Sequence, residues 1–256
     1  MEQDHILTHR ALKVSCKLSQ PDHGPIQRIV LGVHGITGSA QDQIQTDIAE
    51  EMSMFHSAVL RFDLPSHGDS PMPDLTLPTC IESLLAVADF ALKQFPDVED
   101  LCIFATGFGA FVTLNALDEL LELPVKVKLV LHTPSLRMDQ TLLAMLQISE
   151  ERFWVMEDIP IPTKRPLDLT YRFYQELRGH PALAHYNAPM LILHSEADEY
   201  IPMDDIRHFR AINEQSKLVI IPGTSHQFTE DGAWDMVLDL TRDWFEFEQV
   251  LLTDWI

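Results

Sequence analysis

Short, nearly continuous runs of Val, Ile and Leu recur along this chain and alternate with stretches of helical period. The apolar runs lie at residues 28–33, 58–62, 101–105, 127–132, 190–194 and 217–221. Such runs are typical of strands that are buried on both faces of a parallel sheet. Helical period is found at residues 41–55, 81–95, 111–121, 204–212 and 233–252. The alternation predicts an α/β fold, with a mostly parallel central sheet flanked by helices.

Two regions depart from this alternation. Residues 11–18 alternate apolar and polar side chains, which predicts an antiparallel strand at the edge of the sheet. Residues 133–187 contain five prolines around two short helical segments, at 140–148 and 167–178. We interpret residues 133–187 as an insertion between two core strands. We therefore expect a single domain, with its core in residues 1–132 and 188–256.

An insertion at this point would lie over the carboxyl ends of the strands, where open α/β sheets bind ligands. It carries large apolar side chains that are costly to leave in water, namely Phe153, Trp154, Met156, Phe173 and Tyr174. This favours a small lid over a ligand site, although a surface excursion without a ligand role is the alternative. As a lid, it suggests that the ligand carries an apolar acyl or aryl group.

Composition narrows the class of protein. The 256 residues are 46% hydrophobic and carry a formal charge of −21, which would repel a phosphate backbone, so nucleic acid is not an expected partner. The three cysteines lack metal-like spacing, which favours a reducing compartment and no bound metal. The first ten residues do not resemble a secretory signal, and no stretch approaches the ~20 apolar residues of a membrane span. We expect a cytoplasmic protein.

The most informative segment is residues 102–111, which read CIFATGFGAF. An apolar strand runs into a turn with two glycines and then into a helix. This is the layout of a nucleophile elbow, in which a Ser hydroxyl is lifted above the sheet. The apex residue here is Gly107. The chain therefore has the frame of the elbow without its nucleophile.

Four further segments follow predicted strands and carry polar residues. They are HGITGS at 34–39, RFDLPSHGDS at 61–70, LILHSEADEYIP at 191–202 and IIPGTSHQF at 220–228. Together with the elbow, they resemble the α/β-hydrolases, especially the branch of serine aminopeptidases, monoglyceride lipases and cinnamoyl esterases. The resemblance spans nearly the whole chain. It implies the α/β-hydrolase fold and an ancestry in carboxylic-ester hydrolysis, with no cofactor.

The resemblance also assigns roles to individual residues. Gly107 occupies the nucleophile position, and the backbone N–H groups of Ile36 and Phe108 would form the oxyanion hole. Asp198 would be the acid that orients the imidazole of His226, which stands 28 positions later in the chain. The alternative for residues 34–39 is a glycine-rich turn that only connects a strand to a helix.

The remaining polar residues of these segments are expected to be structural. His67 and Asp69 belong to a loop that shapes the floor of the site, and Ser66 stands where the family usually has Gly. Glu196 and Glu199 lie near the predicted acid and are expected to be solvated.

No other side chain is well placed to replace the missing serine. Thr106 precedes the apex and is expected to point away from the cleft, while Cys102 belongs to a buried strand. The hydroxyls of Thr37, Ser39 and Ser225 would be close but badly aimed. Because glycine cannot form an acyl-enzyme, we expect ordinary esterase activity near background.

Three hypotheses of function remain open. The first is a degenerate hydrolase, a pseudoenzyme that binds a small apolar acyl or aryl ligand, or a protein partner, without turnover. The second is an active serine esterase whose elbow Ser was replaced by Gly for crystallisation. The third is an enzyme that uses Asp198 and His226 as a base dyad without a cofactor, like the dioxygenases of this fold. The oligomeric state is not readable, although Trp255 and Ile256 could pack on the last helix or on a neighbouring chain.

Overall fold

The computed structural model describes residues 2–163 and 165–249, and their main sheet has eight strands. These are β1 (Glu2–His9), β2 (Leu12–Ser19), β3 (Arg28–Val33), β4 (Ser57–Phe62), β5 (Asp100–Thr106), β6 (Lys126–His132), β9 (Met190–Ser195) and β10 (Lys217–Ile221). Their order across the sheet is β1-β2-β4-β3-β5-β6-β9-β10. The β1–β2 and β2–β4 pairs are antiparallel and the other five are parallel. The predicted mostly parallel sheet is confirmed.

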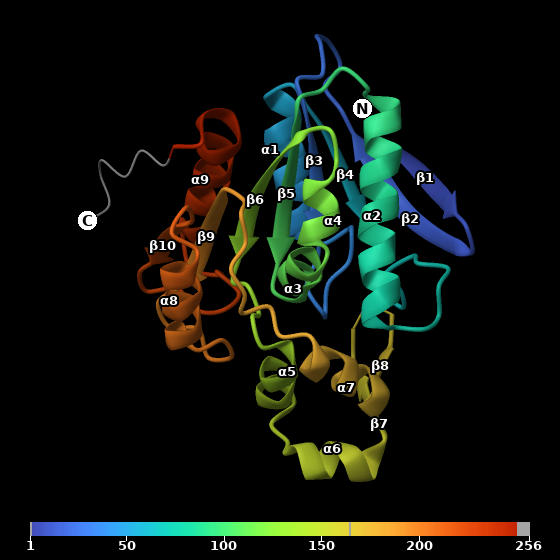
Figure 1. Cartoon of the computed structure of the whole chain (residues 1–256), viewed down its shortest axis with the longest axis vertical. Helices are drawn as coiled ribbons and strands as arrows, with labels where there is room; N and C mark the ends of the chain where they lie inside the picture. The colour runs from blue at the N-terminus through green and yellow to red at the C-terminus, as the bar shows by residue number, and fades with distance from the viewer. Residues whose placement is uncertain (1, 164, 250–256) are drawn as a thin grey trace.

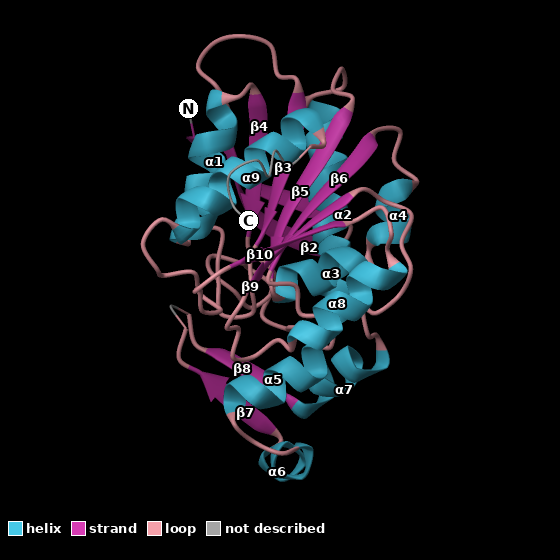
Figure 2. Cartoon of the chain, turned by 90° about the vertical axis from the view of Figure 1, so that its left-hand side faces the viewer, coloured by secondary structure: helices cyan, strands magenta, loops and turns pink. Residues whose placement is uncertain are grey.

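Helices cover both faces of this sheet (Figure 1, Figure 2). One face carries α1 (Gln43–Met54) and α9 (Ala233–Phe247), whose buried apolar side chains pack on β3, β5 and β6. The other face carries α2 (Leu77–Gln94), α3 (Phe108–Asn115), α4 (Leu117–Leu121) and α8 (Met203–Ile212). The two-sided cover explains why the central strands are apolar at nearly every position.

The chain between β6 and β9 forms a separate group of elements. It contains α5 (Met138–Leu146), α6 (Glu150–Met156), β7 (Asp158–Ile161), β8 (Leu167–Thr170) and α7 (Tyr171–Gly179). Figure 1 shows them together at the end of the sheet toward which the arrows of β5 and β6 point. Phe153, Phe173 and Tyr174 are buried, and Phe173 packs edge-on against Phe108 of α3 with ring centroids 5.7 Å apart. This group therefore lies over the carboxyl ends of the parallel strands.

Several element predictions are corrected by the structure. The strand predicted at residues 11–18 is β2, but it is not at the edge, because β1 pairs along its outer side. The helix predicted at 111–121 is divided into α3 and α4 at Ala116, which has φ −104° and ψ 3°. The helix predicted at 167–178 begins as strand β8, and α6 and β7 were not predicted.

Two helix ends also differ from expectation. The helix predicted at 81–95 begins at Leu77, because the Thr76 side chain accepts a hydrogen bond from the N–H of Thr79 and caps the helix. The helix predicted at 233–252 is described to Phe247, and residues 250–252 lie outside the described part of the chain, as do Trp255 and Ile256. Among the described residues, no helix has the length and apolarity needed to span a membrane.

Candidate active site

The predicted elbow joins the end of β5 to the start of α3 at Gly107. This residue has φ 50° and ψ −108°, a conformation that side chains rarely adopt. Its N–H donates to the carbonyl of His132 at 3.0 Å, and its own carbonyl accepts from the N–H of Ser135 at 3.2 Å. A Cβ at Gly107 would find its nearest heavy atom, the carbonyl oxygen of Thr133, 4.0 Å away. The apex therefore keeps the geometry of an elbow and has room for a side chain.

The second glycine of the elbow is needed for packing. A Cβ at Gly109 would lie 2.4 Å from the carbonyl oxygen of Val33 and 2.6 Å from that of His34. These contacts are far inside van der Waals distance, and backbone atoms cannot move aside cheaply. Gly109 thus allows α3 to approach the end of β3, while Gly107 allows the turn.

Asp198 and His226 are in direct contact. The His226 Nδ1 and the Asp198 Oδ2 are 2.7 Å apart, and the Asp198 Oδ1 accepts from the N–H groups of Tyr200 and Ile201, each at 2.9 Å. Burial alone would raise the pKa of Asp198, but the hydrogen bond and charge of His226, together with the two backbone donors, hold it below its ordinary value. An ionised Asp198 fixes the Nδ1–H tautomer of His226 and makes Nε2 the proton acceptor.

Three carboxylates hold the loop that carries His226. The Glu199 Oε2 accepts from the N–H of His226 at 3.1 Å, and the Glu196 Oε2 accepts from the N–H of Gly223 at 2.9 Å. The Glu230 Oε1 accepts from the N–H of Ser225 at 3.0 Å. Glu196 and Glu199 are both exposed, as expected, but each also accepts a hydrogen bond from the backbone of this loop. Glu230 was missed, because a carboxylate four residues after a histidine carries no sequence signal of this contact.

The loop after β3 is fixed from two sides. The His67 Nε2 lies 2.8 Å from the carbonyl oxygen of Ile36, and the His34 Nε2 accepts from the N–H of Leu64 at 3.0 Å. Burial and the nearby His67 lower the pKa of His34 to about 3, so His34 is neutral at physiological pH. Within the described residues, the N–H groups of Ile36 and Phe108 donate no hydrogen bond to the protein. Both groups are thus available to an acceptor in the adjoining cavity.

The loop after β4 explains two further residues. Ser66 has φ 66°, a left-handed conformation that favours glycine, which is why a Ser is unusual at this position. The buried Asp63 accepts from the N–H groups of Ala40 and Asp69, at 2.8 and 3.0 Å, and so ties this loop to the residues before α1. Asp69 is exposed and reaches Gln41.

A cavity of about 290 Å³ joins these pieces. Gly107, His226, Ile36 and Phe108 all line it, whereas Asp198 lies behind the imidazole, with 2% of its side chain exposed against 19% for His226. The structure therefore brings all five predicted site residues to one place. Their catalytic roles stay predictions.

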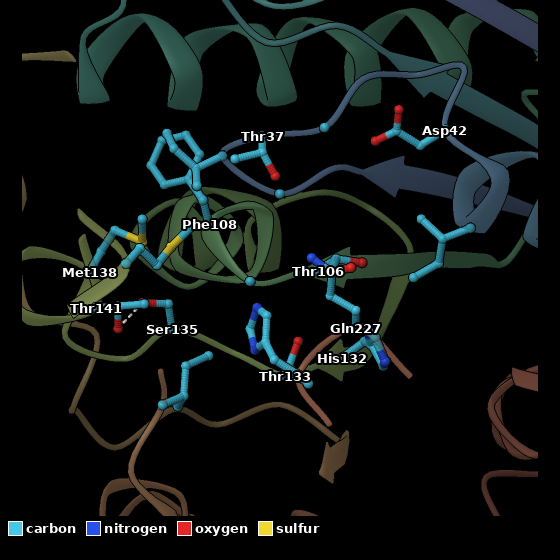
Figure 3. Close-up of a pocket in the computed structure, with 18 residues that line it drawn as sticks. Thr37, Asp42, Thr106, Phe108, His132, Thr133, Ser135, Met138, Thr141 and Gln227 are labelled. Carbon is cyan, nitrogen blue, oxygen red and sulfur yellow. Dashed lines mark hydrogen bonds between the residues drawn. The ribbon is translucent and has the colours of Figure 1, made fainter. Parts of the chain in front are cut away.

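The apolar wall of the cavity is not the one expected from the sequence. Met138 and Met145 of α5 line it, but Phe153, Trp154 and Met156 do not. Trp154 is 63% exposed on α6, at the far end of the group between β6 and β9. Figure 3 shows Met138 and Phe108 on one side of the pocket and Thr106, His132 and Gln227 on the other.

Thr106 also lines the cavity, but its Oγ1 is buried. It lies beside His132, and sequence reasoning gave neither residue a role. Among the described residues, no group of three His, Cys, Asp or Glu side chains is arranged to hold a metal ion.

Solved structures with the same fold have low sequence identity to this chain. Est1E from Butyrivibrio proteoclasticus, solved with ferulic acid bound, superposes with a TM-score of 0.80 at 22% identity, over 94% of this chain and 97% of that one. Alpha/beta hydrolase domain-containing protein 10 from mouse gives a TM-score of 0.75 at 14% identity, over 94% and 97%. The esterase Pf2001 from Pyrococcus furiosus gives 0.69 at 18% identity, over 96% and 93%.

Comparison of sequences assigns the family of this chain more directly. A comparison with curated proteins finds no match to this chain. The sequence pattern of the alpha/beta hydrolase family, however, matches residues 30–239, which is most of the chain. The fold, the order of the site segments and this match agree, and the chain belongs to the alpha/beta hydrolase family.

Proposed function

We propose that this chain is an α/β-hydrolase of carboxylic-ester hydrolase ancestry that binds a small acyl or aryl ligand and, in this form, turns esters over slowly or not at all. The observation that carries the proposal is Gly107. The elbow conformation is kept at a residue that has no side chain, and it opens onto the cavity that His226 also lines. Without a hydroxyl at the apex, no acyl-enzyme can form there.

The other hydroxyls and thiols near the site are poor substitutes. Ser39 donates its hydroxyl to Asp42 at 2.9 Å, so it is engaged in the loop. Cys102 is fully buried, and burial raises the pKa of its thiol to about 12. Thr106 lines the cavity, but its Oγ1 has no hydrogen-bond partner among the described residues, so no base is positioned to activate it.

The other residues that line the cavity support the binding of a carbonyl or ether group. An oxygen of the ligand could accept from the N–H groups of Ile36 and Phe108, while its apolar part contacts Met138 and Met145. The ferulic acid bound to Est1E supports an aryl acid or ester as a ligand class for this fold. Elements α5 to α7 would act as the lid over this ligand.

The test is to restore the missing atom. Gly107→Ser has space for its Cβ, although the positive φ costs a serine roughly 1 to 3 kcal/mol. We expect p-nitrophenyl ester turnover to rise on the order of 10³-fold, with fluorophosphonate labelling at residue 107. Gly107→Ala, which adds only the Cβ, should stay at background. Labelling of the unaltered chain on any hydroxyl would contradict the proposal.

The intact pair of Asp198 and His226 favours a second candidate function. An imidazole held at 2.7 Å by an ionised carboxylate can take a proton from a bound ligand without any nucleophile. This candidate predicts oxygen consumption with an aromatic hydroxyl substrate that His226→Ala abolishes. It also predicts that neither the unaltered chain nor Gly107→Ser hydrolyses esters.

A further inference from the structure

Asp42 is the only carboxylate among the described residues that line the cavity, and none of these residues is Lys or Arg. Asp42 is half-buried, and both hydrogen-bond donors to its carboxylate belong to Ser39, whose backbone nitrogen lies 2.8 Å from Oδ2 and whose Oγ lies 2.9 Å from Oδ1. Within the described part of the chain, Asp42 forms no ion pair with a Lys or Arg side chain. The carboxylate thus brings to the cavity a negative charge that no positive side chain matches.

Two consecutive turns bring Asp42 back to the loop after β3. The N–H of Gly38 donates to the carbonyl of Gly35 at 3.0 Å, and the N–H of Asp42 donates to the carbonyl of Ser39 at 3.2 Å. Asp42 directly precedes α1, where Asp is a favoured capping residue, but its side chain makes no capping hydrogen bond to that helix. A Cβ at Gly38 would lie 2.6 Å from the Asp42 Oδ2, so this glycine makes room for the carboxylate. The carboxylate is therefore held against the loop and not against the helix.

This position is close to the proposed oxyanion hole. Ile36, whose N–H is one of the two proposed donors, is the second residue of the turn that begins at Gly35 and ends at Gly38. The first and last Cα atoms of such a turn are less than about 7 Å apart. Asp42 therefore lies near the place where the oxygen of a bound carbonyl would accept its hydrogen bonds. A negative charge there opposes further negative charge on that oxygen, unless the ligand itself carries a positive charge.

Asp42 and the apolar wall lie on opposite sides of the cavity. Figure 3 shows Met138 on one side and Asp42 on the other, with Thr37 between them in this view. A ligand whose carbonyl oxygen reaches the N–H of Ile36, and whose apolar part contacts Met138, can extend its other end toward Asp42. The formal charge of −21 would also attract a cation to the chain from a distance.

We propose that Asp42 binds a positively charged group of the ligand. The preferred ligand class is then a small ester or amide with an apolar group on one side of the carbonyl and an ammonium group on the other. This inference rests on the proposed function, because it uses the same cavity and the same position for the carbonyl oxygen. It adds a charge to a ligand class that the proposed function defines only by its acyl or aryl part. The cavity volume of about 290 Å³ limits the ligand to a small one.

The test compares two esters of the same shape. They are choline butyrate and neohexyl butyrate, in which a carbon atom replaces the charged nitrogen. Binding of each ester to the full, unaltered chain is measured at low salt by ligand-observed NMR or calorimetry, and the two affinities are compared as a ratio. We expect choline butyrate to bind about fivefold more tightly, which is the upper range for a solvent-accessible ion pair. Equal or tighter binding of neohexyl butyrate, or no binding of choline butyrate, would overturn the proposal.

Variants of Asp42 locate the charge. Asp42→Asn keeps the shape of the side chain, and the hydroxyl of Ser39 can accept a hydrogen bond from the new amide as well as donate one. We expect the affinity ratio to fall to about one, through weaker binding of choline butyrate. Asp42→Ser also removes the charge and places a favoured capping residue before α1, so it decides the matter if Asp42→Asn does not fold.

The matched control is Asp69→Asn, which removes the same charge from a neighbouring loop. Asp69 is exposed and accepts a hydrogen bond from Gln41, but it does not line the cavity. We expect the affinity ratio of this variant to stay within about twofold of that of the unaltered chain, since solvent screens an exposed charge at a distance. A ratio that persists in Asp42→Asn, or that falls equally in Asp69→Asn, would refute the assignment to Asp42.

The two proposals fail separately. Fluorophosphonate labelling of a hydroxyl in the unaltered chain would end the proposed function, and the affinity ratio of the two esters would still report on Asp42. A gain of turnover in Gly107→Ser, together with an affinity ratio that does not respond to Asp42→Asn, would end only the present inference.

Discussion

The elbow at Gly107 and the loops that carry Asp198 and His226 meet at one cavity, but different contacts hold them. Gly107 itself is held by backbone hydrogen bonds, which it makes with His132 and Ser135. The acid and histidine loops have backbone bonds to each other as well, but side chains also hold them, including three glutamates that accept from backbone N–H groups of the histidine loop. The conformation of the elbow therefore does not depend on its own side chain, and the nucleophile can be lost without disturbing its frame. In the two loops, by contrast, the side chains that give the site its chemistry also help to hold the loops in place.

The largest expected effect tests whether the two regions still work together. In the Gly107→Ser variant, we expect His226→Ala or Asp198→Asn to reduce ester turnover by roughly 10³-fold, back to the background of the unaltered chain. The physical reason is the 2.7 Å bond that sets the tautomer of His226. The measurement is p-nitrophenyl ester turnover at saturating substrate. If the double variants keep the gained activity, the new serine works without the pair, and the two regions are not one site.

A second prediction separates the two glycines of the elbow. Gly109→Ala should lower the free energy of unfolding by about 3 kcal/mol, because its Cβ would lie 2.4 Å from a backbone oxygen. Gly107→Ala should cost only about 1 kcal/mol, which is the strain of a positive φ without any overlap.

Urea unfolding of both variants and the unaltered chain measures the difference. Equal costs would mean that the apex is as crowded as the packing glycine. In that case there would be no space for the side chain that Gly107→Ser introduces.

The sequence could predict the elements that show in the side-chain pattern, but not those that depend on tertiary contacts. The strands β3 and β5 were found because their side chains are apolar on both faces, and the site loops because each follows such a strand. Strand β1 was missed, since only Leu7 is buried among its mostly polar residues and its pairing with β2 is a tertiary contact. The small hairpin of β7 and β8 was also missed, because each strand has only four residues.

For the site, sequence order pointed to Asp198 and His226, but it could not show which side chains complete the cavity. The wall formed by Met138 and Met145 depends on how α5 packs over the sheet, and helical period alone does not fix this.

The smallest expected effect concerns pH and the acid loop. Because the pKa of Asp198 is lower in the folded chain than in the unfolded one, its ionised form stabilises the fold above the unfolded pKa of about 4, and this contribution is lost as pH falls through the folded value. Asp198→Asn keeps the shape and an oxygen acceptor but cannot ionise. The difference in unfolding free energy between the unaltered chain and this variant should therefore be largest near neutral pH and shrink between about pH 5 and pH 3. Asp63, whose pKa is raised mainly by burial, titrates in both proteins, so its contribution cancels in the difference.

Urea unfolding at pH 7, 5, 4 and 3 measures the trend. A difference that stays constant or grows on acidification would mean that Asp198 gains no stability from its charge, and the side-chain chemistry of this loop would then be separable from its position, as it is at Gly107.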